Sequence, residues 1–350
     1  MTRRERALAV ADGRTLLSAD PATVSWLTGH VPEIEWGPSP FSAPPVVVVD
    51  GSGRVRIVVS EDETDSLLPD VEPVTFPGFA VEEVDRHSRA IELALSLIDG
   101  RVAGEPLSLP GALARIELDD VGVELQRARA AKDRDELDAI RSAIAIADIG
   151  QAAARSAFVP GVSELELWTL VRAAMESAVG GRLPVLADLV TGPRTADVGG
   201  APGDRRAEHD DLLLVDLVPR IGAYWGDSCA AVAHGDAPGI VRDAHANALA
   251  ALEAAKTAVA PGVRAGEVDA TARALVDYPH HTGHGVGLTV HEQPRIVPGN
   301  DQILEEGMVI ALEPGCYGEG WGVRVEQVVV VTEDGCDVLS GHDIGLYSTT

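Results

Sequence analysis

Two aspartates interrupt an apolar segment that has the pattern of a β-hairpin. Asp216 lies in DLLLVDLVPR and Asp227 lies in IGAYWGDSCAAVA, with a turn expected near Pro219 and Gly222. If the two strands fold back on each other, both carboxylates can approach on one face of the sheet, where they repel unless something neutralises them. The alternative is that one aspartate lies at the sheet edge and the other in the turn.

Four histidines fall within one short, glycine-rich segment, PHHTGHGVGLTVHEQP. They are His280, His281, His284 and His291. Neutral imidazole is a common metal ligand and transfers protons near neutral pH. Because glycines flank His284 and permit close approach of the backbone, the cluster favours a site over histidines that only fill a core.

Two glutamates complete a set of candidate metal ligands. Glu313 follows an apolar run in VIALEPG, and Glu326 lies in VRVEQVVVV, where we expect it in the middle of a strand. Either acid could simply point outward. Together with Asp216, Asp227 and His284, however, they offer about four negative charges and one imidazole, which two divalent cations would balance. The sequence therefore predicts a co-catalytic pair of metal ions that activates water, and the oxygen-rich ligands favour manganese or cobalt, with zinc as a further candidate.

The elements that must position these residues form a helical and β-rich region from residue 131 to residue 350. Capping boxes at Asp133 with Glu136 and at Ser163 with Glu166 mark the starts of two helices. We expect helices over residues 133–158, 163–179, 237–259 and 265–276. We expect strands in the hairpin segments and in GLTVHE, MVIALEP and WGVRVEQVVVVTEDG. This order predicts an α+β domain with helices covering a largely antiparallel sheet.

The first 130 residues have a different texture. A strand–turn–strand signal covers residues 46–60, an amphipathic helical stretch runs from Val81 to Ile98, and a β-like run covers residues 114–125. The helical stretch places Val84, Ile91, Leu95 and Ile98 near helical spacing. The mixture predicts a small N-terminal α/β domain over residues 1–130, consistent with a chain of 350 residues that exceeds the usual size of one core.

Composition restricts the partners. The chain has 28 Lys and Arg against 55 Asp and Glu, a formal net charge of −27. Such a charge argues against nucleic acid and against an anionic membrane surface, because both need basic side chains. Three cysteines without close pairing, and no apolar run near a membrane span, predict a cytoplasmic protein with reduced thiols.

The order of motifs resembles that of the pita-bread metallopeptidases, which include methionine aminopeptidase, prolidase, aminopeptidase P and the metal-free creatinase. The match runs through D-x10-D, HxxGHGxGxxxHE, LEPG and GVRxE, and DPATVSWLTGH at residues 20–30 resembles the N-terminal domain of the prolidase, aminopeptidase P and creatinase branch. The resemblance implies a small N-terminal creatinase-like α/β domain and a C-terminal pita-bread domain with a curved antiparallel sheet covered by helices. Relatives in this branch are often dimers, so a homodimer is expected.

The resemblance also assigns the metal ligands one by one. Asp216 would chelate one metal ion and Asp227 would bridge both. His284 and Glu313 would hold the other ion, and Glu326 would be the second bridge. The glutamate that Glu313 matches is also proposed to shuttle a proton from the bridging water. Since creatinase does not keep this ligand set, the presence of all five favours a metal enzyme over a non-catalytic binding paralogue.

Three further residues gain substrate roles from the resemblance, and one position departs from it. His291 matches a histidine that hydrogen-bonds the substrate and the tetrahedral intermediate, His280 matches a histidine that lines the pocket, and Arg324 matches an arginine beside the last ligand. In the loop GPRTADVGGAPGDR, the position of another substrate histidine falls on Gly199. We therefore expect Gly199→His to raise activity on Xaa-Pro dipeptides.

The expected substrate is a small peptide or amide. The resemblance favours an Xaa-Pro dipeptidase or Xaa-Pro aminopeptidase that uses a metal-activated bridging water. Because Gly199 replaces the histidine, a pita-bread enzyme acting on a small non-peptide metabolite, as a C–N hydrolase or a lyase, remains an alternative. A non-catalytic binding module is a third reading, and metal content after gentle purification would distinguish it from both enzymes.

Overall fold

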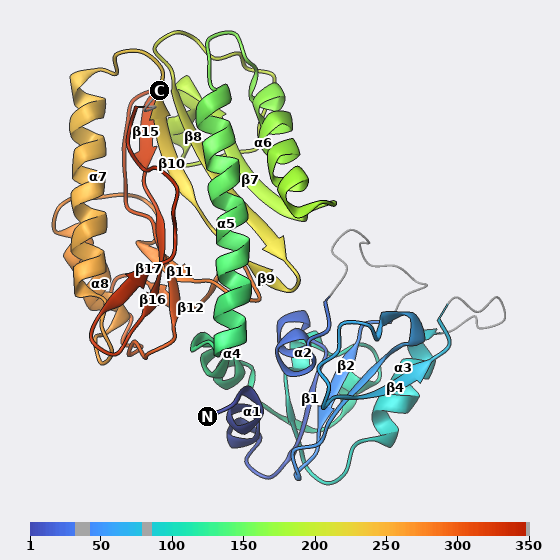
Figure 1. The fold of residues 1–350 in the computed structure, drawn as a ribbon. Helices are drawn as coiled ribbons and strands as arrows, with labels where there is room; N and C mark the ends of the chain where they lie inside the picture. Colours follow the sequence, from blue (N-terminus) through green and yellow to red (C-terminus); the bar gives the residue numbers. More distant parts are fainter. Residues whose placement is uncertain (32–42, 79–85, 348–350) are drawn as a thin grey trace. The chain divides into compact units, whose positions relative to one another are not determined.

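The structure is a computed structural model that describes residues 1–31, 43–78 and 86–347. The chain divides into two compact units, Met1–Arg129 and Ala130–Thr350. In Figure 1 the first unit is drawn in blue to teal and the second in green to red. Each unit contains its own buried apolar clusters, so each can be described by itself.

The first unit is a mixed sheet with helices. Its strand order is β4-β3-β2-β1-β5-β6. The strands are β1 (Thr15–Ser18), β2 (Val46–Val49), β3 (Val55–Ser60), β4 (Glu72–Phe76), β5 (Val102–Gly104) and β6 (Leu118–Asp120). The helices are α1 (Arg3–Ala11), α2 (Pro21–Thr28), α3 (Arg86–Ser96) and α4 (Gly122–Ala130). The predicted strand–turn–strand is confirmed, because β2 and β3 pair antiparallel across the turn that contains Gly53 at φ 86°.

Two predicted elements of this unit differ from the observed ones in their extent or type. The predicted helix over residues 81–98 is found as α3, whereas Val84 and the rest of its first residues lie outside the described part of the chain. The predicted β-like run over residues 114–125 is wrong for most of its length, since only β6 is a strand and α4 follows at once. Val121 and Leu125 are buried but Val123 is exposed. Residues four apart lie on one face of a helix. In a run this short, that pattern cannot be distinguished from the alternation of a strand.

The described part of the second unit has four α-helices. They are α5 (Arg134–Ala157), α6 (Glu164–Val179), α7 (Gly239–Ala258) and α8 (Ala265–Arg273). The two with predicted capping boxes, α5 and α6, begin directly after Asp133 and Ser163. At the start of α6, the Ser163 hydroxyl accepts from the Glu166 N–H and Glu166 accepts from the Ser163 N–H. The fourth helix ends before the expected residue 276, because Ala274 is already its C-terminal cap.

The strands of the second unit pair antiparallel throughout the described residues. One sheet has the order β10-β8-β7 with β9 on β8, a second has the order β12-β11-β13-β16-β17, and β14 pairs with β15. The first sheet contains β7 (Val185–Thr191), β8 (Leu212–Ile221), β9 (Tyr224–Trp225) and β10 (Cys229–Ala233). The second contains β11 (Gly283–Gly285), β12 (Glu292–Ile296), β13 (Val309–Leu312), β16 (Gln327–Val331) and β17 (Cys336–Val338). The hairpin is β14 (Gly315–Gly318) with β15 (Trp321–Arg324).

Helices cover these sheets and give the unit the expected α+β pita-bread architecture. The helix α5 crosses the first sheet and packs against β8, as Figure 1 shows, and α6 packs beside it. The helices α7 and α8 share an apolar cluster with the second sheet, which includes Leu252, Val268, Ile310 and Val329. Burial of these side chains is the main favourable term that holds the layers together.

Two strand predictions in this unit are wrong in detail. Residues 287–291 of the segment GLTVHE form a bend between β11 and β12, and only its last residue, Glu292, belongs to a strand, as the first residue of β12. Glu326 is not in the middle of a strand, because β15 ends at Arg324 and β16 begins at Gln327. The run divides because its first part pairs with β14 and its second part pairs with β13.

No helix within residues 1–31, 43–78 and 86–347 combines the length and apolar composition that a membrane span requires.

Candidate metal centre

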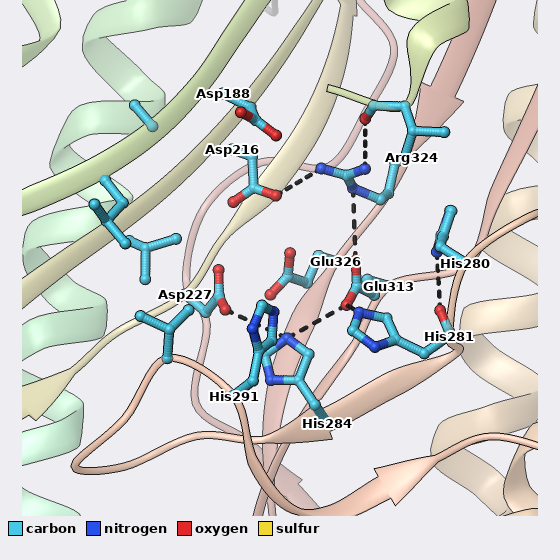
Figure 2. Close-up of a pocket in the computed structure, with 15 residues that line it drawn as sticks. Asp188, Asp216, Asp227, His280, His281, His284, His291, Glu313, Arg324 and Glu326 are labelled. Atoms are coloured by element: carbon cyan, nitrogen blue, oxygen red, sulfur yellow. Dashed lines mark hydrogen bonds and ion pairs between the residues drawn. The ribbon is translucent and has the colours of Figure 1, made fainter. Parts of the chain in front are cut away.

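Strand register brings the two aspartates to one cavity. The strand β8 lies between β7 and β10, and Asp216 is directly opposite Cys229, the first residue of β10. Asp227 lies just before β10 and is buried. Both carboxylates line the cavity shown in Figure 2. The arrangement with one aspartate at a sheet edge and the other in a turn is therefore excluded.

The second sheet supplies His284 and Glu313 to the same cavity. His284 lies in β11, which pairs with β13, and Glu313 follows the last residue of β13. The Glu313 N–H donates to the Thr282 carbonyl at 2.9 Å. Glu326 reaches the cavity from the break between β15 and β16, where its N–H donates to the Cys229 carbonyl at 3.0 Å. The hydrogen bond from Glu326 joins the two sheets at the site.

The cavity has a volume of about 460 Å³. The eight residues to which the sequence assigned metal, catalytic or substrate roles all line it: Asp216, Asp227, His280, His284, His291, Glu313, Arg324 and Glu326. It is also lined by Leu186, Ala187, Asp188, Val198, Val218, His281 and Val290. One part of its wall is thus rich in charge, and another part is apolar.

His284 is oriented by its backbone neighbour. Its Nδ1 lies 3.0 Å from the Gly285 carbonyl, an arrangement that places the proton on Nδ1 and leaves Nε2 facing the carboxylates. Nε2 is 3.3 Å from Glu313 Oε1 and 3.6 Å from Asp227 Oδ2. Although burial opposes it, the hydrogen bond to Glu313 and the charges of both acids raise the pKa of His284 to about 9.

Arg324 pairs with Asp216 and connects it to a loop. Its Nη2 donates to Asp216 Oδ2 at 2.6 Å, and its Nη1 donates to the Val198 carbonyl at 2.6 Å. Its Nε lies 3.7 Å from Glu313 Oε2. The guanidinium therefore fixes one oxygen of Asp216 and leaves the other oxygen, Oδ1, without a described hydrogen-bond partner.

The carboxylates fit a cation-binding site. Asp216 Oδ1 and Glu326 Oε1 are buried and have no hydrogen-bond partner among the described residues. Burial raises the pKa values of Asp216, Asp227 and Glu326, and repulsion from neighbouring carboxylates adds to it. Buried like charges with free oxygens are costly unless a cation is bound, so the donor set suits divalent metal ions.

Glu313 differs from the other three acids. Burial opposes its ionisation, but hydrogen bonds from His281 and His284 hold the pKa of Glu313 well below its ordinary value. The Nε2 of His281 lies 2.8 Å from Glu313 Oε1. His281 belongs to the histidine cluster of the sequence, but its position against Glu313 depends on the pairing of β11 with β13.

His280 and His291 lie at different parts of the cavity. The Nε2 of His280 is 2.9 Å from the Tyr317 hydroxyl. The ring of His291 stands edge-on to that of His284, with centroids 4.3 Å apart. Partial burial and the charges of His284 and His281 lower the pKa of His291 to about 4, so its imidazole is neutral at pH 7.

A buried ion pair holds the bend that carries His291. The Lys132 Nζ lies 2.8 Å from Glu292 Oε2. The other oxygen of Glu292 accepts from the Leu288 N–H at 2.8 Å and from the Thr289 N–H at 3.1 Å. Glu292 thus holds the bend through these contacts. In the sequence, Glu292 stands out only as the residue after His291.

Two groups of side chains have the spacing of metal ligands. Donor atoms of His281, His284 and His291 lie within 4.8 Å of one another, and the same holds for Asp216, Cys229 and Glu326. Cys229 is fully buried, and burial raises the pKa of its thiol well above the ordinary value. Cys229 shares the face of Asp216 because the two residues are cross-strand partners.

The position of the missing substrate histidine lies against an acid. A Cβ atom on Gly199 would fall 2.0 Å from Asp188 Oδ2, so Asp188 must rotate before any side chain fits there. The preceding residue, Val198, has φ 73°, which is rare for a β-branched residue and shows that the loop is held in a special shape. Asp188 was missed, although an acid within the apolar run VLADLVT was a signal of the same kind as Asp216.

Comparisons with known proteins agree with this geometry. Residues 138–333 match Peptidase_M24, the metallopeptidase family M24. The chain is 36% identical over 252 residues to a protein of Mycobacterium tuberculosis named probable dipeptidase PepE, covering 69% of this chain and 67% of the relative. It is 34% identical over 233 residues to the Xaa-Pro dipeptidase of Pyrococcus furiosus, covering 64% of this chain and 66% of that relative.

A solved structure extends the similarity to the whole length. The prolidase from Pyrococcus horikoshii superposes with a TM-score of 0.83 at 25% identity, covering 98% of this chain and 99% of the prolidase. The matched family region contains every acid and histidine that lines the cavity. On this evidence the chain is a metallopeptidase that belongs to family M24, in its prolidase and aminopeptidase P branch.

Proposed function

We propose that the chain is a dinuclear metal-dependent hydrolase of short peptides, with Xaa-Pro dipeptides as the first expected substrates and Xaa-Pro aminopeptidase activity as the second. The observation that carries the proposal is the group of acids around one cavity, two of which have a buried oxygen without a described partner. Relatives named dipeptidase and Xaa-Pro dipeptidase support the substrate class.

Five side chains would hold the metal ions, namely Asp216, Asp227, His284, Glu313 and Glu326. Two bound divalent cations supply charge that polarises a peptide carbonyl and makes water more acidic. Oxygen donors outnumber the single imidazole, which favours manganese or cobalt. All five lie in the second unit, so we also propose residues 131–350 as the catalytic domain.

The remaining residues have roles that follow from their positions. Glu313, held ionised by His281 and His284, can accept a proton from the attacking water and pass it to the leaving amine. Neutral His291 can donate a hydrogen bond to the carbonyl oxygen as negative charge develops on it. His280 would contact the substrate from the cavity wall, and Arg324 would keep Asp216 in place while facing the substrate.

A second candidate function follows from the altered loop. Because Gly199 and Asp188 occupy the region of the expected substrate histidine, hydrolysis of a small non-peptide amide is the alternative. An activity panel on the manganese- or cobalt-loaded protein separates the two, with Xaa-Pro dipeptides, longer Xaa-Pro peptides and non-peptide amides as substrates. Turnover of the dipeptides supports the proposal, and turnover of non-peptide amides alone refutes it. The expected homodimer stays a prediction that light scattering can test.

A further inference from the structure

Asp188 lies inside the cavity and opposite a metal-ligand candidate. It belongs to β7, where it is the direct cross-strand partner of Asp216 on β8. Partners in an antiparallel pair project to the same face of the sheet, and Asp188 lines the same cavity as Asp216. Figure 2 shows its carboxylate beside that of Asp216.

The carboxylate of Asp188 has no ion pair or hydrogen bond to another side chain within the described parts of the chain. Arg324 lines the same cavity, but its guanidinium is already engaged, because it donates to Asp216 and to the Val198 carbonyl. A carboxylate without a cationic partner, facing a cavity, is available to a ligand.

The surroundings of Asp188 leave room for its carboxylate and screen its negative charge only weakly. Gly199 is the residue against it, and a side chain there would occupy the position of Asp188 Oδ2. The neighbouring wall is apolar, formed by Leu186, Ala187, Val198 and Val218. Low-polarity walls screen a charge less than water does, so a cation that enters this part of the cavity is attracted more strongly.

We propose that Asp188 binds a positively charged amine of the substrate and so sets its specificity. The amine is either the α-ammonium of the substrate or the ammonium of a lysine-like side chain, since both offer the same chemistry to a carboxylate. The inference rests on the proposed peptidase function in one respect, namely that the amine that Asp188 binds belongs to a substrate. Asp188 is a specificity residue in this account and not a ligand of the metal ions.

Binding to the manganese-loaded full chain tests the inference without turnover. Three probes share one backbone and a four-carbon side chain and differ in the position of the ammonium group. Norleucine amide carries the α-ammonium, N-acetyl-lysine amide carries the side-chain ammonium, and N-acetyl-norleucine amide, the neutral reference, carries neither. Isothermal titration calorimetry should show that at least one charged probe binds about tenfold more tightly than the neutral probe. The probe that binds more tightly identifies which amine Asp188 recognises.

Two variants make the test specific. Asp188→Asn removes the charge at nearly constant volume and should abolish the preference for the charged probe. Asp197→Asn, which removes an exposed acid from the adjacent loop, should keep it. Both variants should retain the metal content of the parent protein, measured by mass spectrometry of the bound ions.

Three results would overturn the inference. They are equal binding of all three probes, an unchanged preference in Asp188→Asn, and loss of metal from Asp188→Asn, which would make Asp188 a metal ligand. Failure of the peptidase function looks different, because the parent protein would then show the Asp188-dependent preference yet hydrolyse no peptide.

Discussion

Single residues of the centre are held by hydrogen bonds that leave the reactive atoms free. Arg324 binds one oxygen of Asp216, and the Gly285 carbonyl fixes His284 so that Nε2 faces the acids. The residue types at the centre could be predicted from the sequence because acids inside apolar runs and histidines between glycines stand out. Asp188 also interrupts an apolar run, but its place beside Asp216, like that of Cys229, follows only from strand register.

Replacing His291 tests the proposed role of its neutral imidazole. We expect His291→Ala to lower kcat/KM about a hundredfold, because a hydrogen-bond donor to the developing oxyanion is lost. Metal content should stay the same, since His291 is not among the five proposed ligands. Steady-state kinetics and metal analysis on the same sample measure both, and loss of bound metal would assign His291 to the centre instead.

The metal-free protein should lose stability as the pH rises above neutrality. The folded pKa of His284 is about 9, above its ordinary value of 6.5, so its protonation stabilises the fold fully below pH 6.5 and is lost between pH 6.5 and about 9. The raised pKa values of Asp227 and Glu326 also make the folded state more stable at lower pH, where these carboxyl groups are protonated. Thermal unfolding in a chelator should give a Tm that falls from pH 6.5 to pH 9, with a weaker fall in His284→Asn. A rising Tm would contradict this assignment.

Elements place these residues where strands end or break. Glu313 follows β13, Asp227 precedes β10, and Glu326 lies between β15 and β16. The helices could be predicted because their caps are local, as Ser163 and Glu166 show. The division of the segment WGVRVEQVVVVTEDG into β15 and β16 could not be predicted, because it depends on which strand each half pairs with. The bend at residues 287–291 is held by the adjacent Glu292, and Glu292 pairs with Lys132, which lies far away along the chain.

The ion pair that supports this bend should matter for stability. Lys132→Met leaves the Glu292 carboxylate buried without its cation, and the expected loss of unfolding free energy is about 3–5 kcal/mol. The double variant Lys132→Met with Glu292→Gln should recover much of the loss, because no buried charge remains. Urea denaturation of the two variants and the parent chain makes the comparison. Equal destabilisation in both variants would mean that packing, and not the unpaired charge, causes the effect.

The loop and β7 should behave as one coupled unit. The sequence alone predicts that Gly199→His raises activity on Xaa-Pro dipeptides. The structure revises this expectation to little gain for the single variant, because the new Cβ meets Asp188 Oδ2 at 2.0 Å. Combined with Asp188→Gly, the histidine has space and should raise kcat/KM above that of Asp188→Gly alone. Kinetics of the parent protein, the two single variants and the double variant form the cycle that measures the coupling. Additive effects would show that the two positions do not interact.

The whole chain combines a small mixed α/β unit with a larger unit that contains every residue of the centre. The fold class could be predicted from the order of helices and strands together with the motif order. The pairing of strands that are far apart in the sequence could not be predicted in this way. The net charge of −27 is mostly a surface property, yet three acids at the cavity, Asp227, Glu313 and Glu326, are buried, and Asp216 is half-buried. Two divalent ions would change the formal charge to about −23.

Metal stoichiometry tests the central claim most directly. Full-length protein is equilibrated with manganese, freed of unbound ions and analysed by inductively coupled plasma mass spectrometry, beside Asp216→Asn with Glu326→Gln. We expect two ions per chain in the parent protein, and a clear loss in the double variant, which keeps the shape of both side chains but removes their charge. A parent protein that retains no ion, or a double variant that retains two, would contradict the dinuclear centre.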